Sequence, residues 1–170
     1  MPNLIKQTIT NAKWIVGILL LAYSLILLGL YVGQEKLIFF PQSISKQRIK
    51  QIKKYQNGEE INLTTPDGVK LHGWLLDESE QEKSPLIIYF GGNGEEVSEI
   101  LNHKDKFAGW SVLLINYRGY GLSEGQPSED KLYQDALYLY DVFTARKDID
   151  EGQVLAWGRS LGTGVATYLA

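Results

Sequence analysis

The chain has 170 residues, of which 44% are hydrophobic and 22% charged, a composition typical of one folded domain with a targeting segment. Its net charge of −3 and its scattered Lys and Arg residues argue against a nucleic-acid partner. The absence of Cys excludes disulfides, thiolate metal sites and a cysteine nucleophile, and the only histidines are His72 and His103. We expect no metal ion and no cofactor.

The first predicted element is an apolar helix over residues 14–34, preceded by an N-terminal tail of residues 1–13. These 21 residues carry no charge, and as a helix at about 1.5 Å per residue they reach roughly the 30 Å of a hydrocarbon core. Trp14 and Tyr31 stand near its ends, where aromatic rings suit the headgroup regions. Because the run is longer than a secretory h-region and no small-residue cleavage site follows, we expect an uncleaved, single-pass signal anchor.

Basic residues flank the apolar run on both sides, so the charge rule alone does not orient it. A long domain translocates largely regardless of charge, which favours a cytoplasmic N-terminus and a domain outside the cytoplasm. A juxtamembrane linker follows over residues 35–58. Its sequence can form a short basic helix with Ile49, Ile52 and Tyr55 on one side, which either rests on anionic headgroups or serves as a solvated linker.

Regular strand and helix patterns predict a partial α/β domain over residues 59–170. Two runs rich in β-forming residues flank a turn at Pro66-Asp67-Gly68 and predict an antiparallel hairpin. Three apolar runs follow, and a loop and a helical pattern come after each: PLIIYF, WSVLLINY and QVLAWG. Strands that alternate with helices in this way predict a largely parallel sheet covered on both faces.

The sequence GRSLG, residues 158–162, matches the Gly-x-Ser-x-Gly pattern of a nucleophile elbow. Ser160 directly follows an apolar strand and directly precedes a helical pattern, where a strained turn lifts the hydroxyl clear of the sheet. Gly158 and Gly162 let backbone pass close on either side of that turn. A second match, GLSEG around Ser123, lies in a long loop, and we interpret that serine as a turn residue.

A reaction at the serine also needs donors for a developing oxyanion. The glycines Gly91 and Gly92, in the run YFGGNG after an earlier strand, let backbone amides point at a ligand. The start of the helix after Ser160 supplies a further amide. Two motifs in matching positions therefore predict a site for nucleophilic acyl transfer.

The order LIIYFGGNG, LLINYRGYGLSEGQPSE and AWGRSLGTGVA resembles the α/β-hydrolase superfamily. With the apolar anchor and EKLIFFPQS, the chain is similar to the membrane-anchored, Bem46-like branch. The resemblance implies the N-terminal half of an α/β-hydrolase fold and a serine hydrolase that cleaves an ester, thioester or amide through an acyl-enzyme on Ser160. It implies small-molecule or lipid-like acyl substrates, and an oxyanion hole formed by the backbone amides of Leu161 and Asn93. Many members have His-Gly-Asn where this chain has Gly91-Gly92-Asn93, and the histidine at that place is usually structural.

The acid and histidine of the triad follow the serine in this superfamily, but the ten residues after Ser160 contain neither. A serine hydroxyl needs a base to accept its proton, and both histidines precede the serine. We interpret them as structural. The sequence therefore predicts a C-terminally truncated domain that is inactive as given, with its last strand at an unpaired edge of the sheet.

Two alternatives from other functional classes stay open. A membrane-tethered pseudo-enzyme or a gene fragment would contain the same motifs without catalysis. An NAD(P)-binding protein is suggested by Gly158, Gly162 and Gly164, which resemble the glycine pattern of short-chain dehydrogenases. That pattern normally opens the first βα unit and needs an acidic residue about 20 residues later, so we place this alternative lower.

Overall fold

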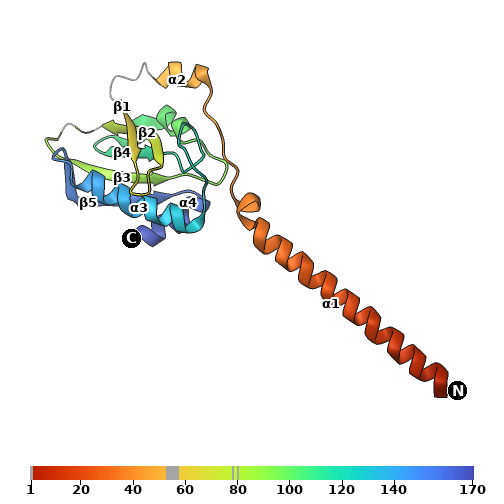
Figure 1. Ribbon diagram of the computed structural model, residues 1–170. Coiled ribbons are helices and arrows are strands. Elements are labelled where there is room, and N and C mark those ends of the chain that lie inside the picture. The colour runs from red at the N-terminus through yellow and green to blue at the C-terminus, as the bar shows by residue number, and fades with distance from the viewer. Residues whose placement is uncertain (1, 53–57, 78, 80) are drawn as a thin grey trace. The chain divides into compact units, whose positions relative to one another are not determined.

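The structure is a computed structural model that describes residues 2–52, 58–77, 79 and 81–170. The chain forms two compact units, Met1–Ile38 and Phe39–Ala170 (Figure 1). The first unit is a single long helix. The second unit is a five-stranded sheet with helices on both of its faces.

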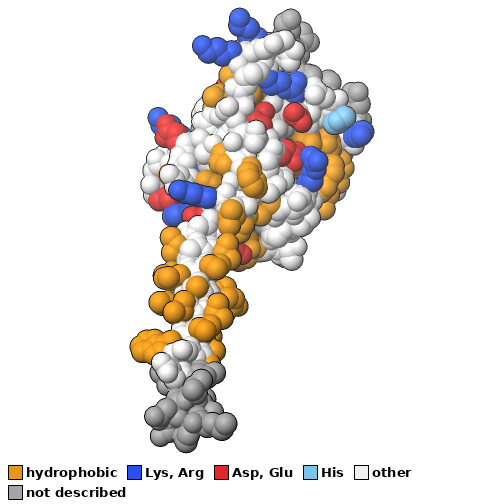
Figure 2. All heavy atoms as spheres, turned by 90° about the vertical axis from the view of Figure 1, so that its right-hand side faces the viewer, with side chains coloured by type: hydrophobic (Ala, Val, Ile, Leu, Met, Phe, Trp, Pro, Cys, Tyr) orange, Lys and Arg blue, Asp and Glu red, His pale blue; other side chains and the backbone are white. Residues whose placement is uncertain are grey.

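The first unit is the helix α1, Pro2–Ile38. Its apolar part, Asn11–Ile38, has a mean hydropathy of 2.6 and no buried residue. Hydrophobic side chains run along this helix in Figure 2. Its length and composition suit a membrane span and equally suit a signal sequence near the N-terminus. The predicted apolar helix over residues 14–34 is confirmed as a helix, and its role as an uncleaved anchor stays a prediction.

The second unit contains a mixed sheet with the strand order β1-β2-β4-β3-β5. Its strands are β1 (Gly58–Thr64), β2 (Lys70–Asp77), β3 (Ser84–Phe90), β4 (Ser111–Ile115) and β5 (Ile149–Gly158). Strands β1 and β2 form the predicted antiparallel hairpin, and β2 pairs antiparallel with β4. Strand β3 pairs in parallel with both β4 and β5. The predicted α/β architecture, a hairpin followed by parallel βα units, is confirmed.

The strands follow the burial expected from their sequences. Every residue of β3 and β4 is buried, as near-continuous apolar strands require when helices cover both faces. Strand β5 pairs on one side with β3 and lies at the edge of the sheet. Leu155 and Trp157 of β5 are 47% and 43% exposed, so the expected apolar edge is present in the described residues.

In the described part of the second unit, four helices accompany the sheet: α2 (Lys46–Ile52), the 3₁₀ helix η1 (Val97–Phe107), α3 (Glu129–Thr144) and α4 (Leu161–Leu169). One hydrophobic cluster joins α3 and α4 to one face of the sheet. A second cluster joins η1 and Ile52 of α2 to the other face. Ile52 of the expected basic helix is therefore buried against the domain, whereas Tyr55 lies outside the described residues.

The segment after β3 differs from the expected α-helix, because it forms the 3₁₀ helix η1 with a kink at His103. Asn102 and His103 are weak helix formers, which favours the break. The apolar residues Val97, Leu101 and Phe107 still face the sheet and are buried. Burial of these three side chains thus fixes the segment, although its hydrogen bonding is not that of a regular α-helix.

An ion-pair network ties the loop after β4 to the rest of the domain. Arg118 is 3% exposed and forms paired hydrogen bonds to Asp135 of α3, at 2.8 and 2.7 Å. It also binds Asp67 of the hairpin turn at 2.8 and 2.9 Å, and these bonds hold the pKa of Asp67 well below its usual range. In the same loop, Ser123 accepts the His72 amide and donates to the Asn116 carbonyl, each at 2.9 Å. These contacts agree with the interpretation of Ser123 as a turn residue.

We expect Arg118→Met to lower the free energy of unfolding by about 3–5 kcal/mol, because it leaves the buried Asp135 carboxylate without its charged partner. Urea unfolding of the full chain in detergent micelles, followed by tryptophan fluorescence, measures the change. The control is Lys70→Met, which removes only an exposed ion pair with Glu124 and should cost less than about 1 kcal/mol. Equal losses in the two variants would contradict the prediction.

Candidate active site

Ser160 occupies the strained turn that the sequence predicts. Strand β5 ends at Gly158 and α4 begins at Leu161. Ser160 lies between them with φ 51° and ψ −116°, the only positive φ of a non-glycine residue in the described part of the chain. Its side chain is exposed and makes no capping hydrogen bond to α4. The backbone therefore presents this hydroxyl to solvent at a conformational cost of about 1–3 kcal/mol.

The elbow glycines are required by close backbone approaches. A Cβ atom on Gly158 would lie 2.2 Å from the carbonyl oxygen of Gly162. A Cβ atom on Gly162 would lie 2.0 Å from the carbonyl oxygen of Phe90, at the end of β3. No side chain fits at either distance. Gly164 has no atom within 4 Å of such a Cβ, so the third glycine of the dehydrogenase-like pattern has no steric role here.

The predicted oxyanion loop, residues 91–94, is held by hydrogen bonds to its carbonyl oxygens. The Tyr117 hydroxyl donates to the Gly91 oxygen at 2.9 Å, and the Tyr120 hydroxyl donates to the Asn93 oxygen at 2.6 Å. The amide of Phe40 also donates to the Asn93 oxygen, at 3.0 Å. Both tyrosines are buried, and burial raises the pKa of each phenol above its usual range, so both stay protonated donors.

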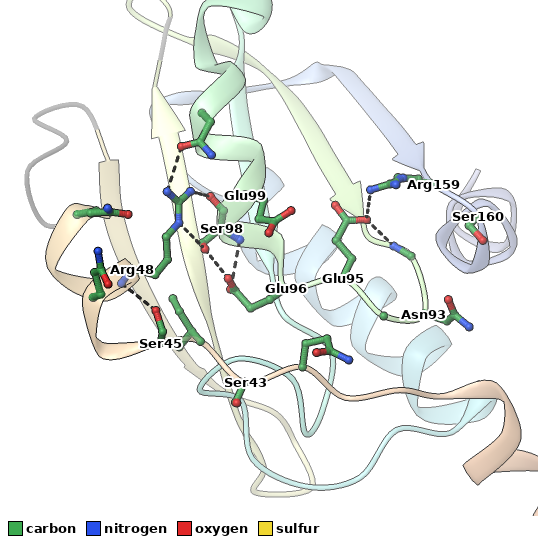
Figure 3. A pocket seen from close by; sticks show the side chains of 17 residues that line it. Ser43, Ser45, Arg48, Asn93, Glu95, Glu96, Ser98, Glu99, Arg159 and Ser160 are labelled. Carbon is green, nitrogen blue, oxygen red and sulfur yellow. Dashed lines mark hydrogen bonds and ion pairs between the residues drawn. The ribbon is translucent and has the colours of Figure 1, made fainter.

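The loop lies directly beside the elbow. A Cβ atom on Gly92 would lie 3.7 Å from the Cβ of Ser160 and 3.8 Å from the carbonyl oxygen of Arg159. Gly92, Asn93, Arg159 and Ser160 all line one groove of about 760 Å³ (Figure 3). Leu161, the other predicted oxyanion donor, is the first residue of α4 and adjoins the serine. The structure thus brings the predicted site residues together, and their catalytic roles stay predictions.

The opposite wall of the groove comes from the segment before the hairpin and from η1. Arg48 of α2 donates to the Ser98 hydroxyl at 3.1 Å, to the Asn102 side-chain oxygen at 3.0 Å and to the Ser98 carbonyl. This guanidinium pins α2 to η1. The other lining side chains on this wall are mainly polar: Gln42, Ser43, Ile44, Ser45, Gln47, Gln51, Glu96 and Glu99. The groove therefore offers hydroxyl, amide and charged groups to a ligand.

Sequence reasoning assigned no site role to Glu95, which the structure places behind the oxyanion loop. Its carboxylate accepts the Tyr89 hydroxyl at 2.7 Å, the Gly92 amide at 2.9 Å and the Arg159 guanidinium at 3.1 Å. Burial, and then the neighbouring carboxylate, raise the pKa of Tyr89 above its usual range. The sequence signal for this ion pair is an acidic residue just after the glycine loop and a basic residue just before the serine.

Neither histidine serves Ser160 in this arrangement. His72 is 3% exposed, its Nε2 lies 2.9 Å from a Glu60 oxygen, and its ring packs edge-on against Trp74 at 4.8 Å. Its strand β2 is separated from β5 by β4 and β3, which at about 4.8 Å per strand puts the strands roughly 14 Å apart. His103 is exposed at the kink of η1 and does not line the groove. Among the described residues, no group of three or more acidic or histidine side chains could hold a metal ion.

Comparisons with known proteins agree with the α/β architecture described above. The model of the family described as "alpha/beta hydrolase fold" matches residues 85–170, half of the chain. The Arabidopsis thaliana protein named "Alpha/beta hydrolase domain-containing protein WAV2" is 33% identical over 147 residues, which cover 80% of this chain and 46% of the relative. "Protein bem46" of Schizosaccharomyces pombe is 32% identical and covers 99% of this chain and 59% of the relative.

A zebrafish relative, "Lysophosphatidylserine lipase ABHD12", is 40% identical over 67% of this chain and 33% of its own length. Among solved structures, an α/β hydrolase from Vibrio vulnificus superimposes with a TM-score of 0.63 at 28% identity, over 75% of this chain and 45% of that one. The chain thus spans about half the length of the relatives that it matches. The resemblance to the Bem46-like branch is confirmed by these relatives.

The close approach at the elbow predicts opposite effects of two neighbouring Gly→Ala substitutions. Gly162→Ala should lower the free energy of unfolding by about 1–3 kcal/mol, because the new methyl group would overlap the Phe90 carbonyl. Gly164→Ala should raise it by about 0.5–1 kcal/mol, because it removes a helix glycine in open space. Urea unfolding of both variants measures the difference, and a Gly162→Ala protein as stable as Gly164→Ala would contradict the steric argument.

Proposed function

Because this chain belongs to the α/β-hydrolase fold family, we propose that it acts in acyl-group hydrolysis with Ser160 as nucleophile. The observation that carries the proposal is the positive φ of Ser160 at a strand-to-helix turn. The Ser160 side chain makes no capping hydrogen bond that would stabilise this turn. Strain of this kind persists where a site needs it, and it matches the geometry of a nucleophile elbow.

In the proposed reaction, the Ser160 oxygen attacks the carbonyl carbon of an ester, thioester or amide while a general base takes its proton. The negative charge that develops on the carbonyl oxygen is met by the backbone amides of Leu161 and Asn93. The leaving group departs with a proton from the protonated base, and an acyl-enzyme forms on Ser160. Water then attacks this ester, restores the hydroxyl and releases the acid.

Among the described residues, no histidine lines the groove to act as the general base. His72 is held in β2 by Glu60, and His103 lies outside the groove, so neither reaches the Ser160 hydroxyl. In the family order, the acid and the histidine follow the nucleophile. Without a general base beside Ser160, we expect the acyl-enzyme to form slowly.

The site and the relatives support a proposal for the substrate class. The groove beside Ser160 is mainly polar, which suits the polar part of an acylated molecule. The zebrafish relative carries the name of a lysophosphatidylserine lipase, and the apolar helix α1 suits a chain that works at a membrane. We place a lipid-like or small acylated substrate in the groove, with its scissile carbonyl at Ser160.

A pseudo-enzyme that keeps the elbow without catalysis is the second candidate function. The two candidates differ in whether Ser160 can be acylated once a base is supplied. The elbow and the oxyanion loop would serve either candidate as scaffold. The distinction is chemical, and it can be tested directly on the serine.

A fluorophosphonate probe tests the nucleophile in the full chain in detergent micelles. We expect slow labelling that added imidazole accelerates, because imidazole supplies the missing general base, and we expect Ser160→Ala to abolish the labelling. The matched control is Ser123→Ala, which alters the other Gly-x-Ser-x-Gly sequence and should leave Ser160 reactive. Labelling that survives Ser160→Ala would refute the nucleophile, and no labelling even with imidazole would favour the pseudo-enzyme.

The proposed anchor has a separate test. We expect the full chain to sediment with membranes, to resist alkaline carbonate extraction and to retain residues 1–38, because the apolar helix is long enough to span a bilayer. Mass spectrometry of the membrane fraction distinguishes this result from signal cleavage. A mature protein without these residues, released by carbonate, would show that α1 is a signal sequence.

A further inference from the structure

Glu95 lies where the oxyanion loop meets the elbow, and its side chain is 8% exposed (Figure 3). Three donors from three segments converge on it: the Tyr89 hydroxyl of β3, the Gly92 amide of the loop and the Arg159 guanidinium beside the nucleophile. Hydrogen bonds to a carboxylate are shorter and stronger than bonds between neutral groups. One buried carboxylate therefore fixes the strand, the loop and the elbow relative to one another.

The bonds at Glu95 also set the direction of the peptide that joins Gly92 to Asn93. The Glu95 amide donates to the Gly92 carbonyl oxygen at 3.2 Å. In a trans peptide the C=O and N–H bonds point in opposite directions, so the Asn93 N–H points away from the Glu95 amide. The Asn93 carbonyl is fixed in turn by Tyr120. The amide assigned to the oxyanion hole is thus oriented from both sides.

The charge of Glu95 needs a partner, because an unpaired carboxylate near a developing oxyanion would repel it. Arg159 supplies that partner with a side chain that is 69% exposed in the groove, directly before Ser160 in the chain. Both carboxylate oxygens already accept hydrogen bonds. The arrangement suits a group that holds the loop and does not suit one that takes the proton of the serine.

We propose that Glu95 is a positioning residue, paired with Arg159, that holds the oxyanion loop in register with Ser160. The proposal rests on the proposed function, because it assigns Glu95 a role in acylation of that serine. It assigns Arg159 a second role, which is to neutralise the carboxylate beside the oxyanion. The proposal assigns neither residue a contact with the reacting atoms.

The test measures acylation by the fluorophosphonate probe in the full chain with saturating imidazole, resolved into probe affinity and maximal labelling rate. Glu95→Gln should lower the maximal rate by about 10- to 100-fold with little change in affinity, because small errors in donor position slow the reaction steeply. Arg159→Met should have a similar effect, and Arg159→Lys should restore most of the rate. Glu151→Gln, at an exposed glutamate of β5, is the matched control and should label like the unmodified chain.

Equal labelling rates for Glu95→Gln and the unmodified chain would overturn the proposal. Because Glu95 is buried, Arg159→Met provides a variant at an exposed side chain that is expected to fold, and an unchanged rate there would equally refute the pairing. A spectroscopic readout separates this outcome from failure of the proposed function. With selective ¹⁵N-glycine labelling, Glu95→Gln should shift the Gly92 amide resonance and Glu151→Gln should not.

The Gly92 resonance does not depend on the reactivity of Ser160. If Ser160→Ala labels as fast as the unmodified chain, the nucleophile assignment fails. The Gly92 resonance then still tests whether Glu95 holds the oxyanion loop. A shift in Glu95→Gln then supports the holding role of Glu95. An unchanged resonance overturns it.

Discussion

The elbow depends on a backbone contact between the end of β3 and the start of α4. The Phe90 carbonyl accepts the Arg159 amide at 2.9 Å, and Gly162 passes so close to the same oxygen that no side chain fits there. Phe90 is the last residue of β3, and the oxyanion loop begins with the next residue. Because these two segments touch through their backbones, the loop must lie beside Ser160.

The sheet topology explains why a groove opens at this place. Strands β3 and β5 are parallel neighbours, so their carboxyl ends meet at one edge of the sheet. The helix that follows β3 packs on one face, and the helix that follows β5 packs on the other. Open α/β sheets bind ligands where the connections from adjacent strands diverge in this way. The oxyanion loop and the elbow are those two diverging connections.

The sequence predicts the parts of the site whose chemistry is local. The Gly-x-Ser-x-Gly pattern predicts the elbow, because both of its glycines are required by close backbone contacts. Gly158 approaches Gly162, and Gly162 approaches the end of β3. Apolar runs likewise predict β3, β4 and β5. The choice of a 3₁₀ helix over an α-helix for η1 was not predictable, because packing of Val97, Leu101 and Phe107 on the sheet outweighs weak local preferences.

Other parts of the site depend on partners that are distant in the chain. Glu95 and Arg159 are 64 residues apart and meet only because β3 and β5 are paired in register. The wall formed by α2 depends on Arg48, which reaches Ser98 and Asn102 across 50 and 54 residues. No periodicity or motif announces such pairs. The partner of such a charged residue can be identified only once the order and register of the strands are known.

The backbone of Ser160 gives the strongest physical reason to look for chemistry at this position. A glycine would adopt φ 51° without a steric cost, whereas the Cβ atom of a serine makes this conformation strained. The serine side chain does not stabilise the fold, because it is exposed and makes no capping hydrogen bond. Hydrogen bonds of the surrounding backbone, from Arg159 to Phe90 and from Thr163 to Ser160, hold the turn instead. The fold therefore needs the turn and not the hydroxyl, which supports the proposed role of Ser160 as nucleophile.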